Sequence, residues 1–239
     1  NDGLYVASST VDITDSTFSN NADLGIDADS ASIVNGVADS TFENNGSSAL
    51  SMGANFGGNV SGGTYSGNGL NRVVLIADTV TQTQTWADVG VPYRLLGDVY
   101  VQGPSNPTLT IADNVTVEHA SGVDFYIATS DNGRLVVNGQ VSGVTFTSDR
   151  VIKNPGDWRG LQIGSFDIGS QIVGLQIEYG GANTYGNIYV SAATNPFFDQ
   201  ITSEFSAYDG LYVSGSVVDV TNSTFRNNNE SGIYMDSTG

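Results

Sequence analysis

The chain has 239 residues, no cysteine and a formal net charge of −18, from 25 Asp and Glu against 7 Lys and Arg. This balance excludes the clustered Lys and Arg that nucleic acids and anionic membranes require, and the absence of Cys excludes disulfides and thiolate metal sites. No run approaches the roughly 20 apolar residues of a membrane helix, so we expect neither a nucleic-acid partner nor membrane insertion.

The start of the chain recurs without a gap as its end. Residues 1–32 and 208–239 share 18 identities at a constant offset of 207. Repetition at a fixed period is the signature of architectures that grow by stacking. General similarity between any two turns of one solenoid is the alternative explanation, but the match extends to non-core positions such as Asp12 and Asp219. We therefore favour a true duplication.

Residues 1–70 contain aromatic side chains at nearly constant spacing. Phe18, Phe42 and Tyr65 follow one another at steps of 42 − 18 = 24 and 65 − 42 = 23, and each is followed by a corner rich in Asn and Gly. Asn and Gly tolerate the left-handed backbone conformation of tight corners. This pattern predicts short strands joined by turns, with one coil for about every 22–25 residues.

The rest of the chain continues the pattern. Segments such as Val99-Tyr100-Val101 alternate at period two, as a half-buried strand does. Ile188, Leu211 and Ile233 follow each other at steps of 211 − 188 = 23 and 233 − 211 = 22. No window has the pattern of an amphipathic helix of ten or more residues. The sequence therefore predicts an all-β solenoid.

Two motifs in the second half carry a family resemblance. Gly156-Asp157-Trp158-Arg159-Gly160-Leu161-Gln162-Ile163 and the later Ile177-Glu178-Tyr179-Gly180-Gly181 are similar to the "W-x-G-I … I-E-Y-G-G" turns of bacterial and archaeal surface proteins. The chain resembles the secreted, pectate-lyase-like β-helix repeat family of the surface-fibre or adhesin type. The resemblance implies a right-handed parallel β-helix and an extracellular or cell-surface location. It implies no activity, because this fold hosts lyases, hydrolases, epimerases and inert stalks.

Three segments follow from this interpretation. Residues 1–70 are expected to close one repeat unit, residues 71–150 to open the next, and residues 151–239 to continue it, with the boundary in Leu70–Thr85. At about 4.8 Å for each turn, one such repeat would advance a fibre by roughly 40 Å.

A search for chemistry finds one cluster of charged residues. Arg150, Lys153, Asp157 and Arg159 lie within ten residues, and with Tyr179 and Tyr185 they form a candidate carbohydrate groove. A loop with local ion pairs is the alternative interpretation. The single His, His119, is expected on the surface or in a loop, and Glu118 should point to the opposite face of their strand. No catalytic motif is present, so we predict no catalytic residue and no enzyme.

Two further kinds of site remain open in the sequence. Asp23, Asp27 and Asp29 form an oxygen-rich segment that either binds Ca²⁺ or is a solvated acidic corner; no other cofactor is implied. The candidate glycosylation sites are the five Asn-x-Ser/Thr sequons, which occur at Asn45, Asn59, Asn114, Asn222 and Asn229.

Tyrosines follow aliphatic residues in several predicted strands. Tyr5, Tyr189, Tyr212 and Tyr234 should therefore point outward, and three of them fall on successive turns. Such a column either stabilises the stack as an aromatic ladder or offers a strip to carbohydrate or a neighbouring fibre.

The leading hypothesis is a structural repeat unit of an extracellular filament, stalk or adhesin, whose partners are copies of itself joined end to end. The expected assembly seam consists of core residues near the two ends, namely Leu4, Val6, Phe18, Ile26, Leu211, Val213, Phe225 and Ile233. A carbohydrate-binding or carbohydrate-cleaving β-helix is the alternative.

Overall fold

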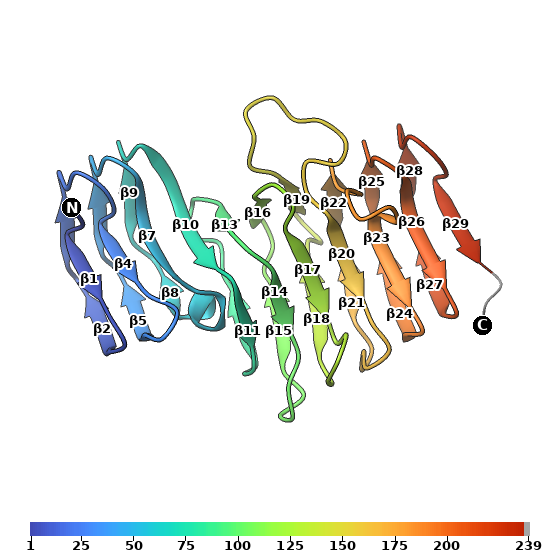
Figure 1. The fold of residues 1–239 in the computed structure, drawn as a ribbon, viewed down its shortest axis with the longest axis horizontal. Coiled ribbons are helices and arrows are strands. Elements are labelled where there is room, and N and C mark those ends of the chain that lie inside the picture. Colours follow the sequence, from blue (N-terminus) through green and yellow to red (C-terminus); the bar gives the residue numbers. More distant parts are fainter. Residues whose placement is uncertain (237–239) are drawn as a thin grey trace.

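The computed structural model describes residues 1–236, and it is an elongated stack of short parallel strands (Figure 1). All of the named strand pairs are parallel, and one sheet has a strand from each of ten successive turns. This confirms the predicted parallel β-helix. Within residues 1–236 the one helix is the short 3-10 segment η1 (Ala54–Asn59), and none is long and apolar enough to cross a membrane.

The ten-stranded sheet runs along the whole stack. Its strands are β1 (Leu4–Val6), β4 (Ile26–Ala28), β7 (Ser48–Gly53), β10 (Leu70–Ile76), β13 (Tyr93–Leu95), β16 (Thr116–His119), β19 (Val144–Ser148), β22 (Leu175–Glu178), β25 (Thr202–Glu204) and β28 (Thr224–Arg226).

The other sides of the coil change partway along the chain. The first turns contain two three-stranded sheets, one of β2 (Thr10–Thr14), β5 (Ile33–Ala38) and β8 (Val60–Ser61), the other of β3 (Thr17–Ser19), β6 (Thr41–Glu43) and β9 (Thr64–Ser66). From residue 78 onward a seven-stranded and a six-stranded sheet replace them.

The seven-stranded sheet consists of β11 (Asp78–Val80), β14 (Val99–Val101), β17 (Asp124–Ile127), β20 (Gly160–Ile163), β23 (Gly186–Ser191), β26 (Asp209–Ser214) and β29 (Ile233–Asp236). The six-stranded sheet consists of β12 (Gln84–Trp86), β15 (Thr108–Ile111), β18 (Arg134–Asn138), β21 (Gln171–Val173), β24 (Thr194–Asp199) and β27 (Val217–Thr221).

Short strands and tight corners explain why the chain coils. Many strands alternate inward apolar residues with outward ones, as in β14, where Val99 and Val101 are buried on either side of Tyr100. The corners use the left-handed conformation predicted for them, with positive φ at Asp15, Asn20 and Asn44 among others. Stacking then buries one continuous apolar core along the helix axis.

Similar side chains stack from turn to turn in this core. Phe18, Phe42 and Tyr65 form an aromatic ladder with ring centroids 5.4 Å apart at each step. Beside it, the Nδ2 of Asn21 donates to the Oδ1 of Asn45 (2.8 Å), whose Nδ2 donates to the Oδ1 of Asn68 (2.8 Å). Buried amides are stable only when hydrogen-bonded, and the ladder satisfies them.

The predicted turn length is correct at the two ends and wrong in the middle. Leu4 pairs with Ile26 (26 − 4 = 22) and Thr202 with Thr224 (224 − 202 = 22). Phe146 lies in register one turn before Ile177 (177 − 146 = 31), because the chain between β19 and β20 bears a loop that leaves the coil. Figure 1 shows this loop projecting beyond the ends of the strands.

The duplicated segment has the same local structure at both ends. The backbone N–H of Leu24 donates to the Oδ1 of Asp2 (3.0 Å), and that of Ser231 donates to the Oδ1 of Asp209 (2.8 Å). The hydroxyls of Ser16 and Ser223 each donate to the carbonyl oxygen two residues earlier, at 2.8 and 2.6 Å. These contacts recur at the offset of the sequence repeat, so the duplication is structural as well as sequential.

The two copies of the segment nevertheless lie on different sides of the coil. Leu4 belongs to β1 in the ten-stranded sheet, whereas Leu211 belongs to β26 in the seven-stranded sheet. Phe18 lies in a three-stranded sheet and Phe225 in the ten-stranded one. Strand β26 comes 26 − 1 = 25 strands after β1. Each turn has three strands, one on each side of the coil, so the second copy of the segment lies eight turns and one side after the first.

The expected seam residues divide into two groups. Leu4 and Phe18 lie in the first turn, and Phe225 and Ile233 in the last, where the stack is open within the described residues. Val6 is in the first turn but already buried. Ile26, Leu211 and Val213 are a correction to the prediction: each is stacked between two strands of its own chain and cannot meet another unit.

Candidate functional site

The outer face of the seven-stranded sheet carries a column of tyrosines. The strand register aligns Thr79, Tyr100, Tyr126, Gln162, Tyr189, Tyr212 and Tyr234 on seven successive strands. Five tyrosines therefore lie in one line, with Gln162 between the second and the third. We call these seven residues the tyrosine column.

The rings of the column contact one another in two groups. Tyr100 and Tyr126 stack with centroids 4.7 Å apart. Beyond Gln162, Tyr185 from the preceding loop stacks on Tyr189 at 4.0 Å, and Tyr212 meets Tyr189 edge to face at 5.4 Å. Partly exposed rings that present both an apolar surface and a hydroxyl are typical of sugar- and protein-binding strips.

Asp124 organises the polar side of this column. Its side chain is buried, and it accepts hydrogen bonds from the Tyr126 hydroxyl (2.8 Å), the Gln162 Nε2 (2.7 Å) and the Arg159 Nη1 (3.1 Å). The backbone N–H of Asp124 donates to the Oδ1 of Asp98 one turn away (2.9 Å). These bonds fix the side chains around the gap between Tyr126 and Tyr189.

The pKa values of two hydroxyls in the column, those of Tyr126 and Tyr212, are raised. Burial and the carboxylate of Asp124 raise the pKa of Tyr126. The hydrogen bond to Asp236 is the main cause that raises the pKa of Tyr212 to about 12. A hydroxyl that donates to a carboxylate holds its proton more tightly, so these two hydroxyls are neutral groups rather than phenolates.

A second cluster lies on the outer face of the ten-stranded sheet, beneath the loop that leaves the coil. Lys153 donates to the Thr147 hydroxyl (2.8 Å), which donates to the Oε1 of Glu178 (2.8 Å), and the Lys153 Nζ lies 5.7 Å from the centre of the Tyr179 ring. Tyr179 in turn stacks on Phe205 at 5.2 Å. The contacts hold the only lysine of the chain against the sheet.

Asp157 fastens the loop itself. It accepts hydrogen bonds from the Ser148 hydroxyl (2.8 Å) and the Asn154 N–H (2.9 Å), and it pairs with Arg150 at 3.4 Å. Val151 and Ile152, between these anchors, are exposed. The loop is therefore held at its base while its apolar tip faces solvent.

The structure separates the six residues of the predicted groove. Arg150, Lys153, Asp157 and Tyr179 gather in and under the projecting loop, with the ion pairs of the alternative interpretation. Arg159 and Tyr185 instead lie beside the tyrosine column. The buried Trp158 separates the two groups along the chain.

His119 was expected at the surface, and that expectation is wrong. Its ring is fully buried and stacks on Trp158 with centroids 3.8 Å apart, while its Nδ1 contacts the carbonyl oxygen of Thr147 (3.1 Å). Burial lowers the pKa of His119 to about 3, so it is a neutral core residue. Glu118 points outward as predicted and pairs with Arg72 at 2.7 Å.

The predicted calcium segment does not converge. Asp29 accepts hydrogen bonds from Ser8, Ala31 and Ser32, and among residues 1–236 no group of three acidic or histidine side chains is arranged to hold a metal ion. Burial and the charges of Asp2 and Asp23 raise the pKa of Asp27.

The sequons differ in accessibility. Asn45 is a correction, because its side chain is buried in the asparagine ladder and has no room for a glycan. Asn59 is half-buried and donates to the Val34 carbonyl (2.7 Å). Asn114, Asn222 and Asn229 are exposed.

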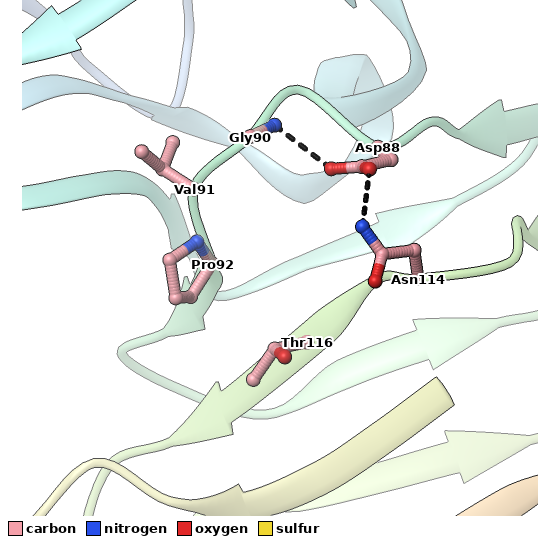
Figure 2. Close-up of a pocket in the computed structure, with 6 residues that line it drawn as sticks. All are labelled: Asp88, Gly90, Val91, Pro92, Asn114 and Thr116. Atoms are coloured by element: carbon pink, nitrogen blue, oxygen red, sulfur yellow. Dashed lines mark hydrogen bonds between the residues drawn. The ribbon is translucent and has the colours of Figure 1, made fainter. Parts of the chain in front are cut away.

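Asn114 borders a hollow of about 140 Å³ lined by Asp88, Gly90, Val91, Pro92 and Thr116 (Figure 2). Asp88 accepts hydrogen bonds from the Asn114 Nδ2 (2.7 Å) and the Gly90 N–H (2.8 Å). This is a hydrogen-bonded corner in which Asp88 is the one ionisable lining residue.

Comparison with known proteins supports the fold. Residues 78–188 match the family model of the pectate-lyase-like β-helix domain. The match covers the projecting loop and the first four positions of the tyrosine column, Thr79 to Gln162, and it fits a parallel β-helix family. No curated protein and no solved structure is detectably similar to the chain.

Tyr100, Tyr126, Asp124 and Gln162 were not identified from the sequence as site residues. Val99-Tyr100-Val101 and Phe125-Tyr126-Ile127 share the alternating pattern of the terminal tyrosine strands. The step between the two tyrosines (126 − 100 = 26) matches one turn, and that spacing was the signal that could have extended the column.

Proposed function

We propose that this chain is part of an extracellular or cell-surface filament, stalk or adhesin built by end-to-end stacking of β-helix units. The observation that carries the proposal is the duplicated turn, whose hydrogen bonds recur at the offset of the sequence repeat. A structure that restarts its own first turn is suited to continue as a repeat. The proposal assigns no catalytic residue.

The composition supports this role. A net charge of −18 keeps a long particle soluble and discourages random lateral association. The stack also needs no disulfides, because each turn is held by its neighbours through parallel ladders and a continuous core.

Electron microscopy of the native material tests the proposal. Eight turns and one further side, at about 4.8 Å a turn, predict filaments with an axial repeat of roughly 40 Å. Short, uniform particles in the native material would contradict it.

A second candidate function is binding of a polysaccharide chain along the tyrosine column. Two observations favour it: the partly exposed rings on either side of Gln162, and the fixed hydrogen-bonding groups of Arg159 and Gln162 at Asp124. The match to a pectate-lyase-like domain is consistent with a carbohydrate ligand. Binding or cleavage of members of a polysaccharide panel tests it, and loss of binding in Arg159→Ala would locate the site at this column.

A further inference from the structure

A polar hollow lies beside η1, where the sheets on the other sides of the coil change. The short helix lies against β5 on one side and against β11 and β12 on the other. Within residues 1–236, neither β11 nor β12 pairs with a strand of the earlier turns. The hollow at this break has a volume of about 380 Å³, inside the range of roughly 300–1,000 Å³ that is typical of small-molecule sites.

The lining of the hollow is uncharged and rich in amides. Its residues are Ile33, Asn35, Asn55, Phe56, Asn59, Gln82, Thr83 and Gln84. Each Asn or Gln side chain has both donors and an acceptor, so it can pair with a hydroxyl group in either direction. A charged ligand would lose its hydration here without meeting an opposite charge among these residues. The lining therefore suits an uncharged ligand with several hydroxyl groups.

Gln84 closes the break between η1 and β12. Its Oε1 accepts a hydrogen bond from the backbone N–H of Gly58 (2.6 Å), and its Nε2 donates to the backbone carbonyl of Asn55 (3.2 Å). A Cβ at Gly58 would lie 2.8 Å from the Oε1 of Gln84, so glycine is needed for this close approach. One wall of the hollow is thus fixed by bonds between side chain and backbone.

Two more amides are held in a known orientation. The Oδ1 of Asn55 accepts from the backbone N–H of Thr81 (2.9 Å), and the Nδ2 of Asn59 donates to the backbone carbonyl of Val34 (2.7 Å). Asn55 therefore keeps its Nδ2 as a donor for a ligand, and Asn59 keeps its Oδ1 as an acceptor. Groups that are already fixed lose little conformational freedom when a ligand binds.

The rim of the hollow adds unused polar groups and apolar surface. Asn35 and Gln82 are exposed, and their side chains have no hydrogen-bond partner in the described part of the chain. Phe56 is half-buried and Ile33 is 44% exposed. A sugar ring, which has an apolar face and hydroxyl groups around its edge, matches an aromatic ring beside free amides.

We propose that this hollow binds a ring of a neutral sugar. The apolar face of the sugar packs against Phe56, while its hydroxyl groups pair with the amides of Asn35, Asn55, Asn59 and Gln82. None of these residues belongs to the tyrosine column, so the site is separate from the column. It also does not depend on the end-to-end stacking proposed above.

Nuclear magnetic resonance of the isotope-labelled full chain tests the site, with protein from a host that does not glycosylate the Asn59 sequon. Galactose, glucose and cellobiose are the neutral probes, and galacturonate is the charged match of galactose. We expect at least one neutral sugar to shift the side-chain amide signals of Asn55 and Asn59 saturably, and galacturonate to shift them much less. No saturable shift with any neutral probe, or an equal response to galacturonate, overturns the proposal.

The double variant N35A/Q82A locates the binding. We expect its affinity for the responding sugar to be about tenfold or more weaker, as for the loss of two hydrogen bonds. Asn229→Ala is the matched control, because it removes an exposed amide in the last turn, away from the hollow. Unchanged affinity in N35A/Q82A, or an equal loss in the control, overturns the site. Circular dichroism and melting verify that both variants are folded.

Discussion

His119 lies face to face with Trp158 in the core, with ring centroids 3.8 Å apart and planes 13° from parallel. The two residues belong to different turns of the coil, and the indole Nε1 donates to the Glu178 carbonyl of the next turn (2.8 Å). The pair therefore ties three successive turns together at the base of the projecting loop.

This packing makes stability depend on pH. Burial holds the folded-state pKa of His119 at about 3, against 6.5 for a free imidazole. Between these two pH values the unfolded chain takes up a proton at His119 and the folded chain does not. The contribution of neutral His119 to the free energy of unfolding is therefore complete above pH 6.5 and is lost as the pH falls. We expect about 2 kcal/mol to be lost on going from pH 7.5 to pH 5, at about 1.4 kcal/mol for each pH unit below 6.5.

The variant His119→Phe isolates this effect, because it keeps an aromatic ring against Trp158 and removes the titrating group. Chemical denaturation of both chains at pH 7.5 and pH 5 gives the difference in their free energies of unfolding. Equal pH dependence in the two chains would mean that the pKa of His119 is the same in the folded and unfolded states, which contradicts its burial.

The asparagine ladder predicts an unequal response to alanine. Asn45→Ala removes the Oδ1 that accepts from the Nδ2 and the backbone N–H of Asn21 and the Nδ2 that donates to the Phe18 carbonyl, whereas the Oδ1 of Asn68 keeps the backbone N–H of residue 45. We expect a loss of about 1–3 kcal/mol in the free energy of unfolding, the usual cost of an unpaired buried polar group. Asn229→Ala, at an exposed sequon outside the left-handed corners, should change it by less than about 0.5 kcal/mol. Similar losses for both variants would show that the ladder is not formed.

Accessibility also predicts which sequons can accept a glycan. In a glycosylating host we expect modification at the exposed Asn114, Asn222 and Asn229 and none at Asn45, whose amide is buried and hydrogen-bonded. Mass spectrometry of peptides checks this. Glycan on Asn45 in the folded protein would contradict the position of that side chain.

Local spacing was enough to predict the coil but not what the turns bring together. The steps between Phe18, Phe42 and Tyr65 specify which residues stack. The change of sheets beyond residue 70 is not visible in that spacing, because β10 accommodates it through a register shift between Leu70 and Val73. The side of the coil on which Leu211 lies therefore needed the structure.

Prediction of the candidate site from the sequence was limited in the same way. Proximity in sequence placed Arg159 with Lys153. In the structure Lys153 lies in the projecting loop and pairs with Glu178, whereas Arg159 comes directly before β20 and pairs with Asp124. Asp124, the partner of Arg159, is 35 residues away along the chain. Nothing in a local window indicates such a contact, whereas the strand register indicates it directly.

The second candidate function makes its own prediction for the tyrosine column. Tyr126→Ala removes the ring that stacks on Tyr100 and the hydroxyl that donates to Asp124. If a polysaccharide lies along the column, we expect its affinity to fall about tenfold, as for the loss of roughly 1.4 kcal/mol of aromatic contact. Tyr5→Ala is the matched control, since Tyr5 is exposed on the ten-stranded sheet. Titration calorimetry with the best ligand of the panel measures both; equal losses would place the ligand elsewhere.

The anchor of the projecting loop is the last test. Asp157→Ala removes the acceptor shared by Ser148 and Asn154 and the partner of Arg150. We expect the variant to lose about 1.4 kcal/mol or more of local stability at the loop. The open form of the loop should then be at least about tenfold more populated. Trypsin should then cleave after Arg150 or Lys153 faster in this variant, while melting of the whole chain changes little. Asp131→Ala, in another corner, should leave the cleavage rate unchanged. Equal cleavage of the variant and the unmodified chain would mean that Lys153, held by Thr147 and Glu178, is enough to keep the loop closed.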